Sequence, residues 1–518
     1  MTSLPGGQMS SADRTEQPEA SRHANVRQES KVRPVALAIW MCLCAGGVLA
    51  LFVPSLQNGV FLIVAATACL LTADIIKVSR GELDPLSVRS LVATVALLSL
   101  VAVPVVQLTT NDFRLTYGVL SASDFLTGYG YFGTLVLIGV SLMYSAAAFM
   151  ERRPSMPPVR TWVVTAGGNW TPLALLIGLA AASAVAVQLI VGGPSGFVSS
   201  VTDRTGFAGL GPLFVFAEST PLLLTIWVVL RHRSRLLRAK PVTLVLLVAL
   251  LAAATLVFFG GLKGSRSTTV FMLLACIGVY AFWVRPLQPK VLAWCGLVAI
   301  AFMLVYGQYK SLGSEAVRKF SAGGVQAVTE ASGRDLNKVL LGDLGRSDVQ
   351  AILAIRHLRG DLDLAQGRTY IGGAAIVVAP RFLFPDRPAG KEFWGTDALQ
   401  GEGSYERGAR STRIYGLAGE SFLNFGPIGP PVAFVVLGLW IGWLSRWSKR
   451  LGRDDVRRIL VPLLSLITAL AIVSDLDNLV WQSLKFLVLP GIALLLASRR
   501  GVTVPAALKK SRQSPASR

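Results

Sequence analysis

The chain has 518 residues, of which 53% are hydrophobic and only 15% are charged, and its formal net charge is +21. Soluble domains usually carry about 25% charged residues, so this composition excludes an ordinary soluble protein and indicates a polytopic membrane protein. The positive charge would suit nucleic acid, but the basic residues gather in every second connection between apolar segments, so we expect no nucleic-acid partner.

Residues 1–33 are polar and mixed in charge, and they predict a disordered cytoplasmic tail. Windows of roughly 20 apolar residues then predict about 12 transmembrane helices, and hence an all-α fold. The predicted spans are Val35–Val53, Val60–Ile76, Leu91–Leu108, Leu126–Phe149, Pro172–Val191, Pro212–Leu230, Pro241–Phe259, Thr268–Val284, Val291–Tyr309, Pro427–Leu444, Ile459–Val473 and Trp481–Ala497.

The spans divide the chain into two membrane regions around one long loop. Residues 34–309 hold about nine spans and residues 414–498 about three, while residues 499–518 form a basic tail. Basic clusters in alternate connections follow the positive-inside rule, which places both termini in the cytoplasm and residues 310–413 outside the membrane. This extracytoplasmic loop contains a predicted amphipathic helix, Asp348–Leu358, and a segment rich in Pro and Gly, Ala379–Gly395.

Several polar residues stand where a membrane makes them costly. Arg204 lies between glycines, and Lys263 and Arg266 begin a span on the outer side, where they form either an anion site at a helix N-terminus or cations that extend to lipid headgroups. The long loop carries further arginines, which are either ligands for a polyanion or diphosphate or ordinary surface charges. These are Arg346, Arg368, Arg381, Arg387, Arg410 and Arg413.

The stretch YGLAGESFLNFGPIGP carries Glu420 and Asn424 to the edge of a predicted span. Ionisable residues at membrane depth are functional candidates by default. Glu218, Asp475 and Asp477 are weaker functional candidates for the same reason. For Glu218 the competing interpretation is a structural pairing with a neighbouring helix.

Signatures of soluble enzymes are missing from the sequence. Of the three histidines, His23 and His232 fall in predicted cytoplasmic segments and cannot join His357 outside, which argues against most zinc sites and Ser-His-Asp triads. The chain has no Walker-type phosphate-binding loop. We therefore expect neither a metal nor a cofactor.

Six motifs in this order resemble the bacterial oligosaccharide repeat-unit polymerases, the Wzy-type O-antigen polymerase family. They are GFVSSVTDRTGFAGLG, GGLKGSRS, LGRSDVQAILAI, GRTYIGG, APRFLFPDRP and YGLAGESFLNFGPIGP. The resemblance implies a GT-C-like membrane glycosyltransferase that uses no nucleotide sugar. It would transfer the growing chain from undecaprenyl diphosphate to the next lipid-linked unit, on the outer face of the bacterial cell membrane.

This chemistry assigns roles to residues of the sequence. Fixed cations would stabilise the diphosphate leaving group, and the candidates are Arg204, Lys263, Arg266 and Arg381; Arg413 is a candidate for binding the diphosphate or a sugar. Glu420 is the candidate general base for the attacking sugar hydroxyl, with Asn424 and Tyr415 as groups that orient sugar hydroxyls. Glu420 could equally cap the glycine-rich backbone, a purely structural role.

The expected partners are the lipid-linked oligosaccharide substrate and membrane lipids, with a chain-length regulator protein as a candidate. Two other functions stay open. An O-antigen-ligase-like transferase would use a histidine of the outer loop, for which His357 is the candidate, but no ligase-like motif surrounds it. A lipid-linked oligosaccharide flippase would need charges spread over many spans rather than concentrated in the outer connections.

Overall fold

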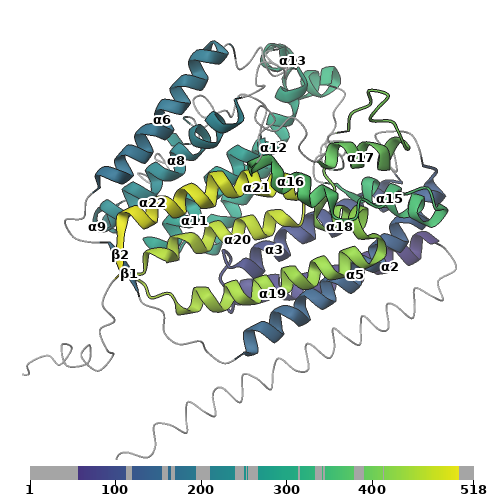
Figure 1. Cartoon of the computed structure of the whole chain (residues 1–518), viewed down its shortest axis with the longest axis horizontal. Helices are drawn as coiled ribbons and strands as arrows, with labels where there is room; N and C mark the ends of the chain where they lie inside the picture. Colours follow the sequence, from purple (N-terminus) through teal and green to yellow (C-terminus); the bar gives the residue numbers. More distant parts are fainter. Residues whose placement is uncertain are drawn as a thin grey trace, which may run out of the picture.

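A computed structural model describes the central part of the chain. The described residues are 56–111, 120–153, 161–164, 170–193, 196, 210–239, 250–251, 254, 266–312, 315–332, 341, 345–378, 390–411 and 413–500. These residues are mainly helical, as the apolar composition predicted, and Figure 1 shows long helices lying side by side in a bundle.

Among the described residues, seven helical stretches are long and apolar enough to cross a membrane. They are α2 (Leu56–Ser79), α3–η2–α4 (Val88–Ala96, Leu97–Ala102 and Val103–Thr110), α5 (Ala122–Arg152), α6 (Thr171–Val191), α8 (Gly211–Arg231), α18–η6–α19 (Gly416–Phe425, Gly426–Ile428 and Gly429–Arg450) and α21–η8–α22 (Leu476–Ser483, Leu484–Val488 and Leu489–Ala497). The prediction of a polytopic helical membrane protein is therefore confirmed, while the number of spans stays a prediction.

The remaining predicted spans divide into two groups. Val35–Val53 and most of Pro241–Phe259 lie outside the described residues. Three others coincide with α11 (Arg266–Trp283), α12 (Pro289–Leu312) and α20 (Leu460–Ala471). The other described helices are α9 (Arg233–Arg238), α13 (Glu315–Ser332), α15 (Ser347–Arg359), α16 (Arg368–Val378), α17 (Lys391–Gln400) and η7 (Val456–Ile459).

The close approach of α5 and α19 forms the spine of the larger core. A Cβ atom on Gly438 would fall inside van der Waals contact with the main-chain oxygen of Met143, and one on Gly139 would meet the ring of Phe434. Small residues let apolar helices approach this closely, and dispersion contacts then stabilise the pair. The second core, between α6, α8, α11, α20 and α22, is built around Leu222 and Ile226.

The polar segment after α12 packs back onto the bundle instead of standing apart from it. In Figure 1, α15, α17 and α18 lie together at the right of the bundle. The predicted amphipathic helix is α15, but residues Ser347–Ile355 are all buried, because α5, α17 and α18 surround it. Arg359 at its end forms an ion pair with Asp124 at the start of α5, with 2.7 Å between Nη2 and Oδ1.

One short sheet interrupts the predicted all-α fold. Strand β1 (Trp162–Val164) pairs antiparallel with β2 (Ser498–Arg500), and Val163 lies opposite Arg499. The pair lies at the left end of the bundle in Figure 1, away from α15 and α17. Three-residue strands in connections carry too little hydrophobic periodicity for the sequence to predict them.

Candidate functional site

The stretch that carries Glu420 is helical, and this helix is buried. Glu420 lies in the middle of α18 and its residue is only 3% exposed. Its Oε1 accepts a hydrogen bond from the Thr369 hydroxyl at 2.9 Å, and its Oε2 accepts one from the Leu476 backbone N–H at 2.8 Å. Both oxygens of this carboxylate are therefore engaged by groups from two other helices, α16 and α21.

Asn424, one turn further along α18, completes the connection to α16. Its Nδ2 donates to the Thr369 hydroxyl at 2.6 Å and to the Glu420 carbonyl at 2.8 Å, while its Oδ1 accepts from the Gly367 N–H at 3.0 Å. Gln366 and Gly367 both have positive φ, so the chain turns sharply just before α16 begins. The Thr369 hydroxyl thus accepts from an amide and donates to a carboxylate, which fixes its orientation.

Glu420 and Asp475 cap each other's helices. Asp475 precedes α21, yet its Oδ1 accepts from the N–H groups of Tyr415 and Gly416, where α18 begins, at 2.8 Å each. Glu420 of α18 in turn accepts from Leu476, the first residue of α21. A carboxylate at a helix N-terminus satisfies orphan N–H groups and interacts favourably with the helix dipole. This reciprocal capping explains why two acidic residues lie among apolar helices.

A lysine from α17 neutralises part of this charge. The Lys391 ammonium donates to Asp475 Oδ2 and lies 3.6 Å from Asp477 Oδ1. Burial opposes ionisation of Lys391, but the two carboxylates outweigh it and raise its pKa. Burial also raises the pKa of the Tyr370 phenol on α16, with contributions from Glu420 and Asp475. The capped junction, defined as Glu420, Thr369, Asn424, Asp475 and Lys391, therefore joins four helices.

Two further predicted site residues flank this junction. Tyr415 is 1% exposed, and its hydroxyl donates to the Gly395 carbonyl of α17 at 2.7 Å. Arg413 forms an ion pair with Asp348 at the start of α15, with 2.7 Å between Nη2 and Oδ2. In this arrangement both side chains hold polar helices against the bundle, and their predicted contacts with a glycan stay predictions.

Four of the cations predicted to hold a diphosphate have side chains outside the described part of the chain. Arg204, Lys263 and Arg381 lie outside the described residues. Arg266 is the first residue of α11, and its side chain is not among those described. Their predicted role is neither supported nor opposed by the geometry of the described part of the chain.

His357, the candidate residue of a ligase, lies on α15 and packs edge-on against Phe422 of α18, with ring centroids 5.5 Å apart. This contact gives the His357 ring a packing role between α15 and α18. Within the described ranges, no group of three or more His, Cys, Asp or Glu side chains is arranged to hold a metal ion.

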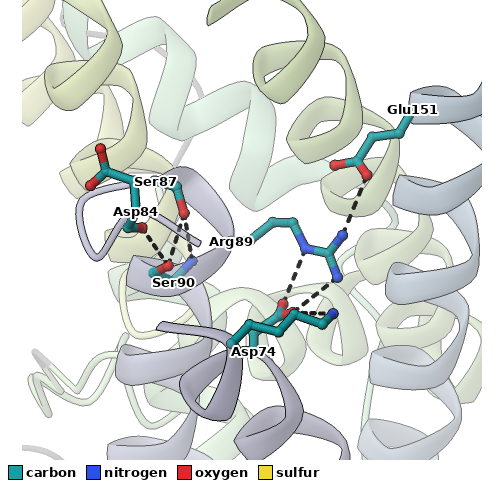
Figure 2. A network of polar contacts seen from close by, with 7 residues as sticks. Asp74, Asp84, Ser87, Arg89, Ser90 and Glu151 are labelled. Atoms are coloured by element: carbon teal, nitrogen blue, oxygen red, sulfur yellow. Dashed lines mark hydrogen bonds and ion pairs between the residues drawn. The ribbon is translucent and has the colours of Figure 1, made fainter. Parts of the chain in front are cut away.

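Beyond the junction, Asp74 and Glu218 each belong to a buried ionic cluster, and the first of these was not predicted. Asp74, fully buried in α2, accepts from Arg89 of α3 and from Lys77, and Arg89 also reaches Glu151 of α5 at 3.4 Å (Figure 2). A small cavity of about 10 Å³ borders Asp74 and Arg89, which is at the lower limit of the space that one water molecule needs. An acidic residue inside the apolar run of α2 was the sequence signal that could have revealed this cluster.

The second cluster pairs Glu218 of α8 with Lys485, which lies in the π-helical turn η8, at 2.6 Å. The sequence predicts either a functional role for Glu218 or a structural pairing with a neighbouring helix, and this ion pair supplies such a structural partner. Ser219 adds a hydrogen bond to the Lys485 carbonyl at 3.0 Å. A buried charge near a membrane is tolerated when it is paired in this way.

The capped junction lies far from the Asp74 cluster. Asp124 at the start of α5 contacts the end of α15, whereas Glu151 lies 27 residues further along α5, about 40 Å away at 1.5 Å per residue. No protein-family model, curated protein or solved structure matches the chain. The resemblance to repeat-unit polymerases therefore rests on the sequence motifs alone.

The capped junction contains one buried carboxylate, that of Glu420, that accepts a hydrogen bond from a hydroxyl group. The 2.9 Å separation between Thr369 Oγ1 and Glu420 Oε1 is within the range in which a general base can receive a proton from an alcohol. The Thr369 hydroxyl and the Leu476 N–H hold this carboxylate in one orientation, and Asn424 in turn fixes the Thr369 hydroxyl. Such preorganisation by surrounding hydrogen bonds is what an acid–base group requires.

Proposed function

We propose that this protein is a membrane glycosyltransferase that polymerises lipid-linked oligosaccharide repeat units into a surface polysaccharide or exopolysaccharide. In this proposal it is a GT-C-like enzyme of the O-antigen polymerase type in the bacterial cell membrane, with both termini in the cytoplasm and α15, α16 and α17 on the outer side. The support comes from the polytopic helical fold, the ordered motifs of the sequence and the position of Glu420.

The reaction would proceed by displacement at an anomeric carbon. The acceptor hydroxyl of the incoming unit loses its proton to Glu420 as its oxygen bonds to the anomeric carbon of the growing chain. The bond between that carbon and the undecaprenyl diphosphate breaks, and the diphosphate leaves with the electron pair. Fixed cations would stabilise the negative charge of this leaving group, and Arg204, Lys263, Arg266 and Arg381 remain the proposed residues.

The observation that carries the proposal is the hydrogen bond from a hydroxyl to the buried Glu420 carboxylate. In the structure that hydroxyl belongs to Thr369, and Glu420 is only 3% exposed. A sugar hydroxyl would have to take the place of the Thr369 hydroxyl, which can turn away by rotation about its side-chain bond. Asn424 would then hold Thr369 in its alternative position or donate to the sugar directly.

The test is deletion of the gene in its host, followed by sizing of the surface polysaccharide and of the lipid-linked intermediates. A polymerase predicts that long chains collapse to single repeat units and that the intact gene restores them. Long polymer still attached to its lipid carrier would instead establish a ligase. Single units retained on the cytoplasmic face would establish a flippase and remove the proposed role of Glu420.

A further inference from the structure

A continuous row of aromatic rings and guanidinium groups runs from the start of α16 across α17 to the segment 401–411 that follows α17. The Arg368 Cζ lies 5.0 Å from the centroid of the Trp394 ring, and Trp394 packs edge-on against Phe393, with centroids 5.2 Å apart. Phe393 packs edge-on against Tyr405 at 5.2 Å, and the Arg410 Cζ lies 3.7 Å above the Tyr405 ring. We call these five residues the arginine–aromatic row.

The row begins next to the proposed general base. Arg368 directly precedes Thr369, whose hydroxyl donates to Glu420. Phe393 and Trp394 lie on α17, which is held to the bundle by the ion pair of Lys391 with Asp475. The rings are therefore supported by the same contacts that position the carboxylate.

The polar ends of the row are accessible. Arg368 and Arg410 are exposed, and the three rings between them are partly exposed. Among the described residues, the Arg368 guanidinium lies over the Trp394 ring and makes no hydrogen bond or ion pair. Arg410 donates to the carbonyls of Tyr405 and Ala409, and its Nε lies 4.0 Å from the Glu392 carboxylate.

This combination has the chemistry of a carbohydrate-binding surface. Aromatic side chains offer large apolar area at low conformational cost, against which the C–H faces of pyranose rings can pack. Guanidinium groups present several donors in a planar fork, which can bind neighbouring sugar oxygens in pairs. Acidic side chains such as Glu392 offset the positive charge near Arg410, so the row is suited to a sugar chain rather than to a highly charged anion.

We propose that the arginine–aromatic row binds several pyranose units of the glycan chain and leads that chain to Glu420. This inference rests on the proposed function, because it assigns a substrate surface to the same site. The ligand is the sugar portion of the substrate, not the lipid or the diphosphate, since the row lies on α16, α17 and residues 401–411 and not on the seven apolar spans. Trp394 and Tyr405 supply the stacking faces, and Arg368 binds the sugar nearest the carboxylate.

The test is a binding measurement that needs no catalysis. Oligosaccharides released by mild acid from the lipid-linked pool of the source strain carry the native sugars without lipid or diphosphate. Their affinity for the full chain in detergent is measured by calorimetry. Trp394→Ala should weaken binding by about tenfold or more, as expected when a central aromatic contact is lost. Trp294→Ala is the matched control, because Trp294 is 66% exposed on the apolar helix α12.

Arg368→Gln provides a second variant in case Trp394→Ala fails to fold, since Arg368 is exposed and its replacement leaves the rings in place. We expect it to weaken binding while thermal unfolding stays unchanged. Normal affinity in both variants, or no measurable binding by the unaltered protein, would overturn the proposal.

The two proposals fail in different ways. If deletion of the gene leaves single repeat units but both variants bind and extend chains normally, the polymerase stands and the row is not its glycan surface. If binding depends on Trp394 but deletion leaves chain length unchanged, the row stands as a glycan site and the polymerase is wrong.

Discussion

Replacing Glu420 by Gln or by Ala separates its proposed chemical role from its structural one. Gln keeps an oxygen that can accept from the Leu476 N–H, and its amide N–H can donate to Thr369, because a hydroxyl has two lone pairs. Gln loses the negative charge at the start of α21, which contributes about 0.3–1 kcal/mol, and the acceptor for the Thr369 hydroxyl proton, whose hydrogen bond contributes about 0.5–1.5 kcal/mol. Ala removes both acceptors, and a buried donor left unsatisfied costs about 1–3 kcal/mol in addition to the lost packing.

The two variants should therefore differ in stability and agree in activity. We expect Glu420→Gln to lower the free energy of unfolding in detergent by about 1–2 kcal/mol, and Glu420→Ala to lower it clearly more. Loss of a general base lowers rates by about 10²–10⁴-fold. The Gln variant should thus be present in the membrane at normal amounts yet yield mostly single repeat units.

Chain length is measured on polysaccharide from a deletion host that expresses each variant, and protein amount is measured by immunoblot. Normal chain lengths with Glu420→Gln would refute the role as a base and leave Glu420 as a helix cap. A Gln variant as unstable as the Ala variant would show instead that the charge itself holds the junction together.

Three further changes test the fold. Lys391→Met leaves the Asp475 carboxylate buried without its cation and should lower the free energy of unfolding in detergent by about 3 kcal/mol. A double variant that also carries Asp475→Asn should recover part of this loss. Gly438→Ala should cost about 1–3 kcal/mol in the same assay because the neighbouring helix leaves no space for a methyl group. The control is Gly452→Ala, which should change stability by less than about 0.5 kcal/mol because Gly452 has open space around it. Asp74→Asn should lower the thermal unfolding temperature by disrupting the network of Figure 2, and an unchanged temperature would show that this network contributes no net stability.

Hydropathy predicted most of the membrane helices because each span is a local property of about 20 residues. The sequence also singled out Glu420 and Asn424, since an ionisable residue beside an apolar run is unusual. Their partners could not be predicted in the same way. Thr369 lies 51 residues from Glu420, and Lys391 lies 84 residues from Asp475, so only the packed helices bring them together.

The burial of α15 was missed for a related reason. Its pattern of apolar and charged residues predicts one apolar face, but α5, α17 and α18 together cover the polar residues near its start as well. Ser347 is satisfied there by a hydrogen bond to Gln107 of α4 and Asp348 by its ion pair with Arg413. A polar residue that finds its partner on a distant segment looks solvent-exposed in sequence and is buried in the fold.

The most direct measurement of the central claim is reconstitution of the purified protein in liposomes with lipid-linked repeat units alone. No nucleotide sugar, metal or second protein is added, and the products are separated by size. The account predicts a ladder of chains longer than one unit, which forms with the unaltered protein and is greatly reduced with Glu420→Gln. If only single units remain although the protein is folded and the lipid-linked substrate is accessible to it, the account is contradicted.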